Sequence, residues 1–126
     1  MATAPKGYLV EVNSKTNVVY LKVWGQWEEA DGRAYVEFFR GKVAHLLGKK
    51  WYVVADISEF PPQSEVVNAQ IAKTMEHATK GGMVKAADIV SSAMTQLQIK
   101  RLSEEMRIPV FAFFKDRAAA EAWVVS

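Results

Sequence analysis

WYVVADI, residues 51–57, is a nearly unbroken apolar run. Such a run is typical of a β-strand that is buried on both faces. An amphipathic helical pattern precedes it, in which Tyr35, Phe39 and Val43 recur at helical spacing. A second helical pattern begins at Ser64 and Glu65, after two prolines. A doubly buried strand between two helices predicts a parallel sheet with helices packed on it.

The rest of the chain extends this alternation. Two runs rich in β-branched residues, 8–13 and 17–23, predict a β-hairpin. Gly48 ends the first helix in a left-handed conformation, at about Leu47. Later we expect helix 64–80, a strand within 83–90, a helix from Ser91 or Ser92 to about Met106, strand 110–114 and a helix capped by Asp116. The prediction is one α/β domain over residues 8–126, with a mixed, mostly parallel sheet in the order β-β-α-β-α-β-α-β-α, after a flexible arm at 1–7.

Composition excludes several classes of function. Sixteen basic and fourteen acidic residues leave a formal charge of +2, so we expect no nucleic-acid partner. The absence of cysteine excludes disulfides and thiolate chemistry. No stretch has the length of a signal-peptide core or a membrane span, so we expect a cytoplasmic protein without membrane insertion.

Sites in parallel sheets gather at the carboxyl ends of the strands. Asp56 and Ser58 stand at one such end, before Phe60 and the two prolines. Asp56 is either a site residue or a carboxylate that accepts hydrogen bonds from loop amides, and we favour the second. Ser64 is first a helix N-cap, and its exposed position also suits phosphorylation.

The motifs of catalysis are missing from the sequence. His45 and His77 have no histidine or cysteine at ligand spacing, and Gly81-Gly82 lacks the context of a phosphate loop. We therefore expect no enzyme activity, metal or cofactor. An enzyme that uses Asp56 with Asp88 or Asp116 is the weakest alternative.

Aromatic residues cluster in the first third of the chain and suit an apolar pocket or a partner groove. Phe38 and Phe39 are adjacent on a helix, so one of them must face away from the core. The plain alternative for the cluster is the core itself. Its members are Trp24, Trp27, Tyr35, Phe38 and Phe39.

Three stretches resemble the SpoIIAA-like branch of the STAS domains, the fold of sulfate transporters and anti-sigma-factor antagonists. VYLKVWG at 19–25 resembles the second strand of that family, and VVADI at 53–57 resembles its central strand. The closing stretch IPVFAFFKDRAAAEAWV, 108–124, is similar to the family's ending, with Ala120 and Trp123 at matching positions. The likeness extends over nearly the whole chain.

The resemblance implies a non-enzymatic module that binds a protein partner, sometimes under control of phosphorylation, or in related members a nucleotide or an apolar ligand. The family's Asp-Ser-Ser-Gly-like segment reads FPPQSE here, residues 60–65, which leaves Ser64 as the candidate phosphoacceptor. We expect a regulatory or scaffolding module; a carrier or sensor of a small apolar, lipid-like molecule is the alternative. A homodimer, formed through the exposed aromatic residues or through the hairpin edge, is a further option. The predicted contact residues are Trp24, Trp27, Phe38, Asp56, Ser58, Phe60 and Ser64.

Overall fold

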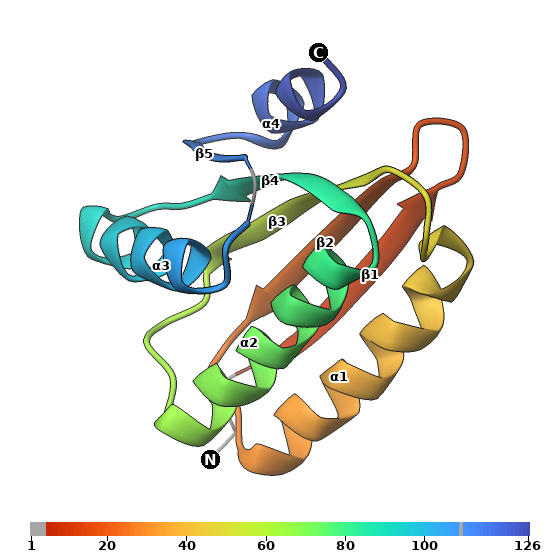
Figure 1. Cartoon of the computed structure of the whole chain (residues 1–126). Helices are drawn as coiled ribbons and strands as arrows, with labels where there is room; N and C mark the ends of the chain where they lie inside the picture. The colour runs from red at the N-terminus through yellow and green to blue at the C-terminus, as the bar shows by residue number, and fades with distance from the viewer. Residues whose placement is uncertain (1–4, 109) are drawn as a thin grey trace.

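The computed structural model describes residues 5–108 and 110–126. A five-stranded sheet with the order β1-β2-β3-β4-β5 forms its centre (Figure 1). β1 pairs with β2 in antiparallel fashion, and the three other pairings are parallel. The strands are β1 (Gly7–Asn13), β2 (Val18–Trp24), β3 (Trp51–Glu59), β4 (Met83–Ile89) and β5 (Phe111–Phe114). The predicted element order and mixed, mostly parallel sheet are confirmed.

Helices cover both faces of the sheet, unequally. Figure 1 shows α1, α2 and α3 on one face and α4 on the other, beside β4 and β5. Side-chain caps fix where three helices begin: Ser64, Ser92 and Asp116 accept hydrogen bonds from the backbone of α2, α3 and α4. The helices are α1 (Glu29–Val43), which continues into the 3₁₀ turn η1 (Ala44–Leu46), α2 (Glu65–Lys80), α3 (Ala93–Glu105) and α4 (Arg117–Val124).

The two faces of the sheet form two hydrophobic cores. Along β3, Val53 and Ala55 join the larger core under α1 and α2, whereas Val54 joins the smaller core under α4. Successive side chains of a strand point to opposite faces, so a strand covered on both sides needs apolar residues throughout. This geometry explains the unbroken apolar run from which the fold was predicted.

Several element ends differ from the sequence prediction by one residue, and two differ by more. The first helix ends at Val43 and tightens into η1, which buries Leu46, instead of continuing to Leu47. Gly48 follows with φ of +87°, the predicted left-handed conformation. β3 runs two residues past Ile57, because Glu59 pairs with Trp24 beyond a register shift.

The predicted arm at residues 1–7 is held by the fold where the structure describes it. Gly7 is the first residue of β1, and the Lys6 ammonium lies 2.7 Å from the Asp31 carboxylate at the start of α1. Residues 1–4 lie outside the described residues. Within the described ranges, no helix combines the length and the apolar character that a bilayer crossing requires.

Candidate functional site

The carboxyl ends of the parallel strands meet at one edge of the sheet, where the loop after β3 leads to α2 (Figure 1). Most of the predicted contact residues belong to this edge or to the aromatic cluster beside it. The structure gives each of them a defined environment, and it separates some that the sequence places together.

Gln63 anchors the loop between β3 and α2. Its Oε1 atom accepts a hydrogen bond of 2.8 Å from the backbone N–H of Trp27. Its Nε2 atom donates to the carbonyls of Gly25 at 3.0 Å and Pro61 at 2.7 Å. One amide side chain therefore joins the ends of β2 and β3. Gln63 was not predicted from the sequence, because no motif marks a structural amide.

Trp27 lies behind this loop. Its side chain is 4% exposed, and its ring contacts Phe60 with a centroid separation of 5.1 Å. The indole N–H donates to the carbonyl of Trp24 at 3.1 Å, so its polar atom is satisfied within the fold. Trp27 is therefore a core residue, and we remove it from the predicted contact surface. Phe60 is half-buried and forms part of a cavity wall.

Asp56 and Ser58 form a local hydrogen-bonded pair. Asp56 Oδ1 accepts from the backbone N–H of Ser58 at 3.0 Å and from its hydroxyl at 2.6 Å. This arrangement confirms the favoured prediction of a carboxylate that accepts hydrogen bonds from the backbone. The Tyr20 hydroxyl donates to Asp56 Oδ2 at 3.4 Å, which places this pair on the α4 face. Burial raises the pKa of Tyr20, with a further contribution from the Asp56 charge.

Ser64 lies on the opposite face, at the start of α2. Its hydroxyl oxygen accepts a hydrogen bond of 3.3 Å from the backbone N–H of Val67, so the predicted N-cap is confirmed. Its role as a phosphoacceptor stays a prediction. Since Asp56 and Ser58 face α4, the single surface predicted from Asp56 to Ser64 is divided by the edge of the sheet. The sequence cannot show this division, because it depends on the strand register.

Phe38 and Trp24 complete the predicted set. Phe38 is 41% exposed while Phe39 is 1% exposed, so the prediction that one of the two faces outward is confirmed. The Phe38 ring contacts Tyr8 of β1 and lies under the Lys42 ammonium. Trp24 is half-buried, and its ring lies where Gly7 leaves no side chain.

The acidic residues do not assemble into a catalytic group. Asp56 faces α4, Asp88 faces α2 and α3, and Asp116 caps α4 through a 2.8 Å hydrogen bond from the Ala119 N–H. The three carboxylates therefore do not lie together, as an enzyme that uses Asp56 with Asp88 or Asp116 would require. Among residues 5–108 and 110–126, no three His, Cys, Asp or Glu side chains lie where they could hold a metal ion.

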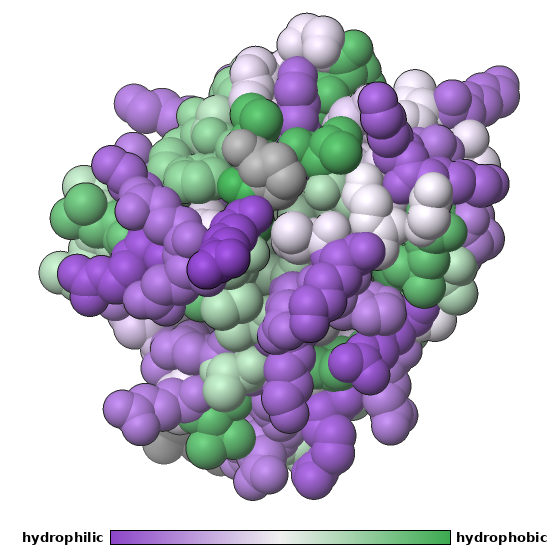
Figure 2. All heavy atoms as spheres, in the orientation of Figure 1, coloured by the Kyte–Doolittle hydropathy of each residue, from purple (hydrophilic) through white to green (hydrophobic). Residues whose placement is uncertain are grey.

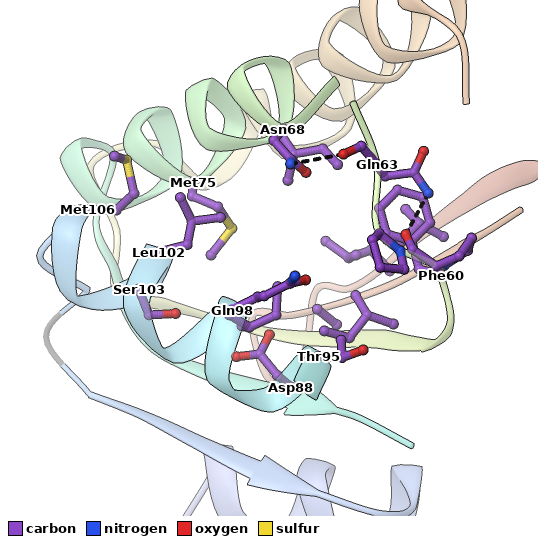
Figure 3. Close-up of a pocket in the computed structure, with 18 of the residues that line it drawn as sticks. Phe60, Gln63, Asn68, Met75, Asp88, Thr95, Gln98, Leu102, Ser103 and Met106 are labelled. Atoms are coloured by element: carbon purple, nitrogen blue, oxygen red, sulfur yellow. Dashed lines mark hydrogen bonds between the residues drawn. The ribbon is translucent and has the colours of Figure 1, made fainter. Parts of the chain in front are cut away.

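A cavity lies between the sheet, α2 and α3. It encloses about 90 Å³. Figure 2 shows hydrophobic atoms in the groove between α2 and α3, with hydrophilic side chains on both sides. Figure 3 shows Met75, Leu102 and Met106 at one end and Phe60, Gln63 and Asn68 at the other. Further apolar walls come from Leu21, Val23, Ala55, Ile57, Ile71, Ile99 and Ile108.

Asp88 is the acidic residue in the wall of this cavity, and it was not connected with a ligand from the sequence. Its side chain is 3% exposed, and its Oδ2 atom has no hydrogen-bond partner among the described residues. Burial raises the pKa of this carboxyl to about 7. The signal in the sequence is an aspartate inside the apolar strand AADIV, residues 86–90.

A wider and shallower groove runs along the carboxyl ends of β3, β4 and β5. Its volume is about 840 Å³. The Ser91 hydroxyl donates to the Ser58 carbonyl at 2.8 Å and thereby joins the loop after β4 to the end of β3. The groove is lined by Ser58, Val90, Ser91, Ser92, Ala93, Gln96, Phe113, Phe114 and Lys115.

Comparison with known proteins identifies the fold. No family model matches the chain, and no curated protein matches it. A solved structure of an uncharacterized DUF3478-family protein from Shewanella loihica PV-4, described as having a SpoIIAA-like fold, is similar with a TM-score of 0.78 and 17% identity, over 98% of each chain. The chain has a SpoIIAA-like fold.

A second solved structure supports the same conclusion. An anti-sigma factor antagonist from Mycobacterium paratuberculosis is similar with a TM-score of 0.65 and 18% identity, over 99% of this chain and 100% of that one. The resemblance to the SpoIIAA-like fold inferred from the sequence is confirmed. At these identities the likeness shows the fold, and the function has to be argued from the site.

Proposed function

We propose that this chain is a non-catalytic regulatory or scaffolding module that binds a protein partner at the carboxyl edge of its sheet. The observation that carries the proposal is the groove at the ends of β3, β4 and β5, which is open to solvent and whose neighbouring loops are joined by a hydrogen bond. The Ser91 hydroxyl donates to the Ser58 carbonyl and so ties the loop after β4 to the end of β3. A groove that is ordered before binding lowers the entropic cost of association.

Two further observations support a partner at this edge. Met94 and Leu97 of α3 are each 67% exposed. They follow directly in sequence the groove-lining residues Ala93 and Gln96. Large exposed apolar side chains contribute to partner binding when they adjoin a polar rim. An anti-sigma factor antagonist has the same fold. The proposal includes a cytoplasmic location, in keeping with the cysteine-free sequence.

The test places a bulky charge in the groove. Ala93→Arg and Gln96→Arg alter two exposed lining residues of α3, and each should abolish co-purification of the partner from the source cell. Thr16→Arg is the matched control, because Thr16 is exposed in the β1–β2 turn at the other end of the strands. Equal recovery of the partner by all variants would place its contact elsewhere.

The cavity between α2 and α3 favours a second function, a carrier or sensor of a small apolar molecule. Its walls are mostly apolar, with a few polar groups at one side, as in most small-molecule sites. Native mass spectrometry of protein purified from its host should show a bound mass. Leu102→Trp, which fills the cavity, should remove that mass. An unliganded spectrum under gentle conditions would reject this function.

Self-association through β1 is part of the proposal. β1 is an end strand of the sheet, so its outer edge offers backbone groups to a second copy. The exposed Phe38 packs against Tyr8 of the same strand and adds an apolar contact. Sedimentation velocity should show a dimer that Phe38→Glu dissociates; a monomer at all concentrations would reject it.

A further inference from the structure

The carboxyl of Asp88 points into the cavity between α2 and α3 without a partner. Figure 3 shows it beside Thr95 and Gln98 of α3. The Oδ2 atom is buried and accepts no hydrogen bond from the described residues. A buried polar atom without a partner destabilises a fold by about 1–3 kcal/mol, and native structures rarely leave one unsatisfied. The donor that Oδ2 lacks is therefore best supplied by a molecule that enters the cavity.

The walls of the cavity determine what else that molecule carries. Met75 of α2 and Ile99 and Leu102 of α3 line the same cavity as the carboxyl. These side chains offer dispersion contacts and no hydrogen bonds. Methionine is flexible and fits irregular guests. The guest consequently has a hydrocarbon body and one polar end.

We propose that the cavity binds a short aliphatic amine, with its ammonium group at the Asp88 carboxylate and its hydrocarbon chain between α2 and α3. The inference rests on the second proposed function, an apolar-ligand site, and specifies its ligand.

An amine fits the carboxyl better than other amphiphiles of the same length. An ionised carboxylate accepts hydrogen bonds only, and an ammonium group donates them only. Charge-assisted hydrogen bonds are about twice as strong as neutral ones. An alcohol leaves the buried charge without a counter-ion, and a carboxylic acid would place a second negative charge beside Asp88.

The size of the cavity limits the chain length. Its volume of about 90 Å³ is below that of an engineered apolar cavity of roughly 150 Å³ that binds benzene. n-Butylamine is about as large as benzene, so an amine with four carbons requires α3 to move outward. α3 is the helix suited to such a movement, since Ser103 is its one fully buried residue.

Binding should depend on pH because the carboxylate has to be ionised. Of the cavity-lining residues, Asp88 and Tyr35 of α1 are titratable, and the lining residues from α2, α3 and the neighbouring strands are uncharged. Burial raises the pKa of Asp88 to about 7 and also raises that of Tyr35. An aliphatic amine keeps its proton in this range, so its affinity should rise about tenfold or more from pH 5.5 to pH 8.

The experiment titrates the purified protein with n-butylamine and, separately, with n-butanol. Methyl NMR signals of Ile99, Leu102, Met75 and Met106 report occupancy of the cavity. Asp88→Asn keeps the shape of the side chain and removes its charge, and it should weaken amine binding at least tenfold at pH 8. Glu105→Gln removes an equal charge from an exposed position on α3 and should leave binding unchanged.

A measurement on the unaltered protein complements the variants. The carboxyl ¹³C signal of Asp88 should titrate with a lower apparent pKa when n-butylamine is present, because the ammonium group stabilises the ionised form. n-Butanol should produce no comparable decrease. This readout does not depend on whether Asp88→Asn folds normally.

The outcomes separate the ligand class from the cavity function. Amine binding that needs Asp88 and strengthens with pH supports the proposal. Equal binding of n-butanol and n-butylamine, unaffected by Asp88→Asn, overturns the amine inference and leaves an apolar site. Unchanged methyl signals with both probes at millimolar concentrations overturn the inference and the apolar-ligand function together.

Discussion

Asp56 and Asp88 lie on neighbouring parallel strands, one register position apart, and their side chains point to opposite faces of the sheet. Asp56 pairs with Ile89, while Asp88 pairs with Ala55. Asp56 accepts hydrogen bonds from Ser58 and Tyr20 on the α4 face, and Asp88 enters the cavity under α3. Among the described residues, the first carboxylate is satisfied by hydrogen bonds and the Oδ2 atom of the second is not, so Asp88 is the carboxylate available to a ligand.

Asp88 should make folding stability depend on pH. Burial raises its folded-state pKa to about 7, whereas an unfolded aspartate has a pKa near 3.9. The folded state thus holds the proton more tightly, and its contribution to stability is lost as pH rises from about 4 to about 7. Asp88→Asn, which does not titrate, should remove about 2–3 kcal/mol of the difference in unfolding free energy between pH 5 and pH 8. Urea unfolding of both proteins at pH 5 and at pH 8 measures this difference in unfolding free energy.

Glu105→Gln is the control for that series, since it changes the net charge equally at an exposed site. Its pH dependence should match that of the original protein. Identical pH slopes for the original protein and Asp88→Asn would mean that Asp88 is solvated or paired in solution.

Gln63 should hold the loop at the carboxyl edge. Gln63→Ala leaves the Trp27 N–H and the Gly25 carbonyl without their partner, at a cost of about 1–3 kcal/mol. We expect faster amide hydrogen exchange at Trp27 and little change in the β3 and β4 amides. Gln26→Ala removes two exposed hydrogen bonds of 3.3 Å, to the Pro62 carbonyl and to Gln63 Oε1, but keeps the bond between Gln63 and the Trp27 N–H, so it should leave the exchange rate of Trp27 almost unchanged. Equal exchange in both variants would show that the prolines alone order the loop.

The fold could be predicted from the sequence because its signals are local. The unbroken apolar run of β3 indicates a strand that is covered on both faces. Ser64 and Asp116 mark the starts of two helices, because their side chains can cap a helix N-terminus. Such signals act over one or two turns of chain and need no knowledge of distant contacts. They locate elements well and place side chains only approximately.

The candidate site was predicted less well because it depends on long-range register and burial. The face that Asp56 occupies depends on the alternation along β3 and its pairing with β2, which also contains a register shift. From the sequence, Trp27 could line a pocket or belong to the core; it is buried against Phe60, a residue 33 positions later. The apolar neighbours of Asp88 in the sequence indicate burial, but they do not show that its side chain faces a cavity under α3.

Trp27 and Phe38 should differ strongly in their contribution to stability. Trp27→Ala removes a buried side chain that touches Phe60, Tyr35 and Tyr8, and it should cost about 3–5 kcal/mol. Phe38→Ala acts on a side chain that is 41% exposed and should cost less than about 1 kcal/mol. Denaturant unfolding of both variants tests the assignment of Trp27 to the core. Similar small losses would return Trp27 to the candidate contact surface.

Ser64 offers a test that separates helix capping from a regulatory role. Its hydroxyl oxygen accepts the Val67 N–H, so Ser64→Ala should lower the unfolding free energy by about 1 kcal/mol. Ser64→Asp keeps an acceptor at the same place and adds negative charge at the amino end of α2, where the helix dipole favours it. Its stability should therefore stay within about 0.5 kcal/mol of the original protein. If partner binding in the co-purification assay changes in Ser64→Asp while stability does not, the charge at this position regulates binding, as phosphorylation would. If both substitutions leave stability unchanged, the cap contributes nothing measurable to α2.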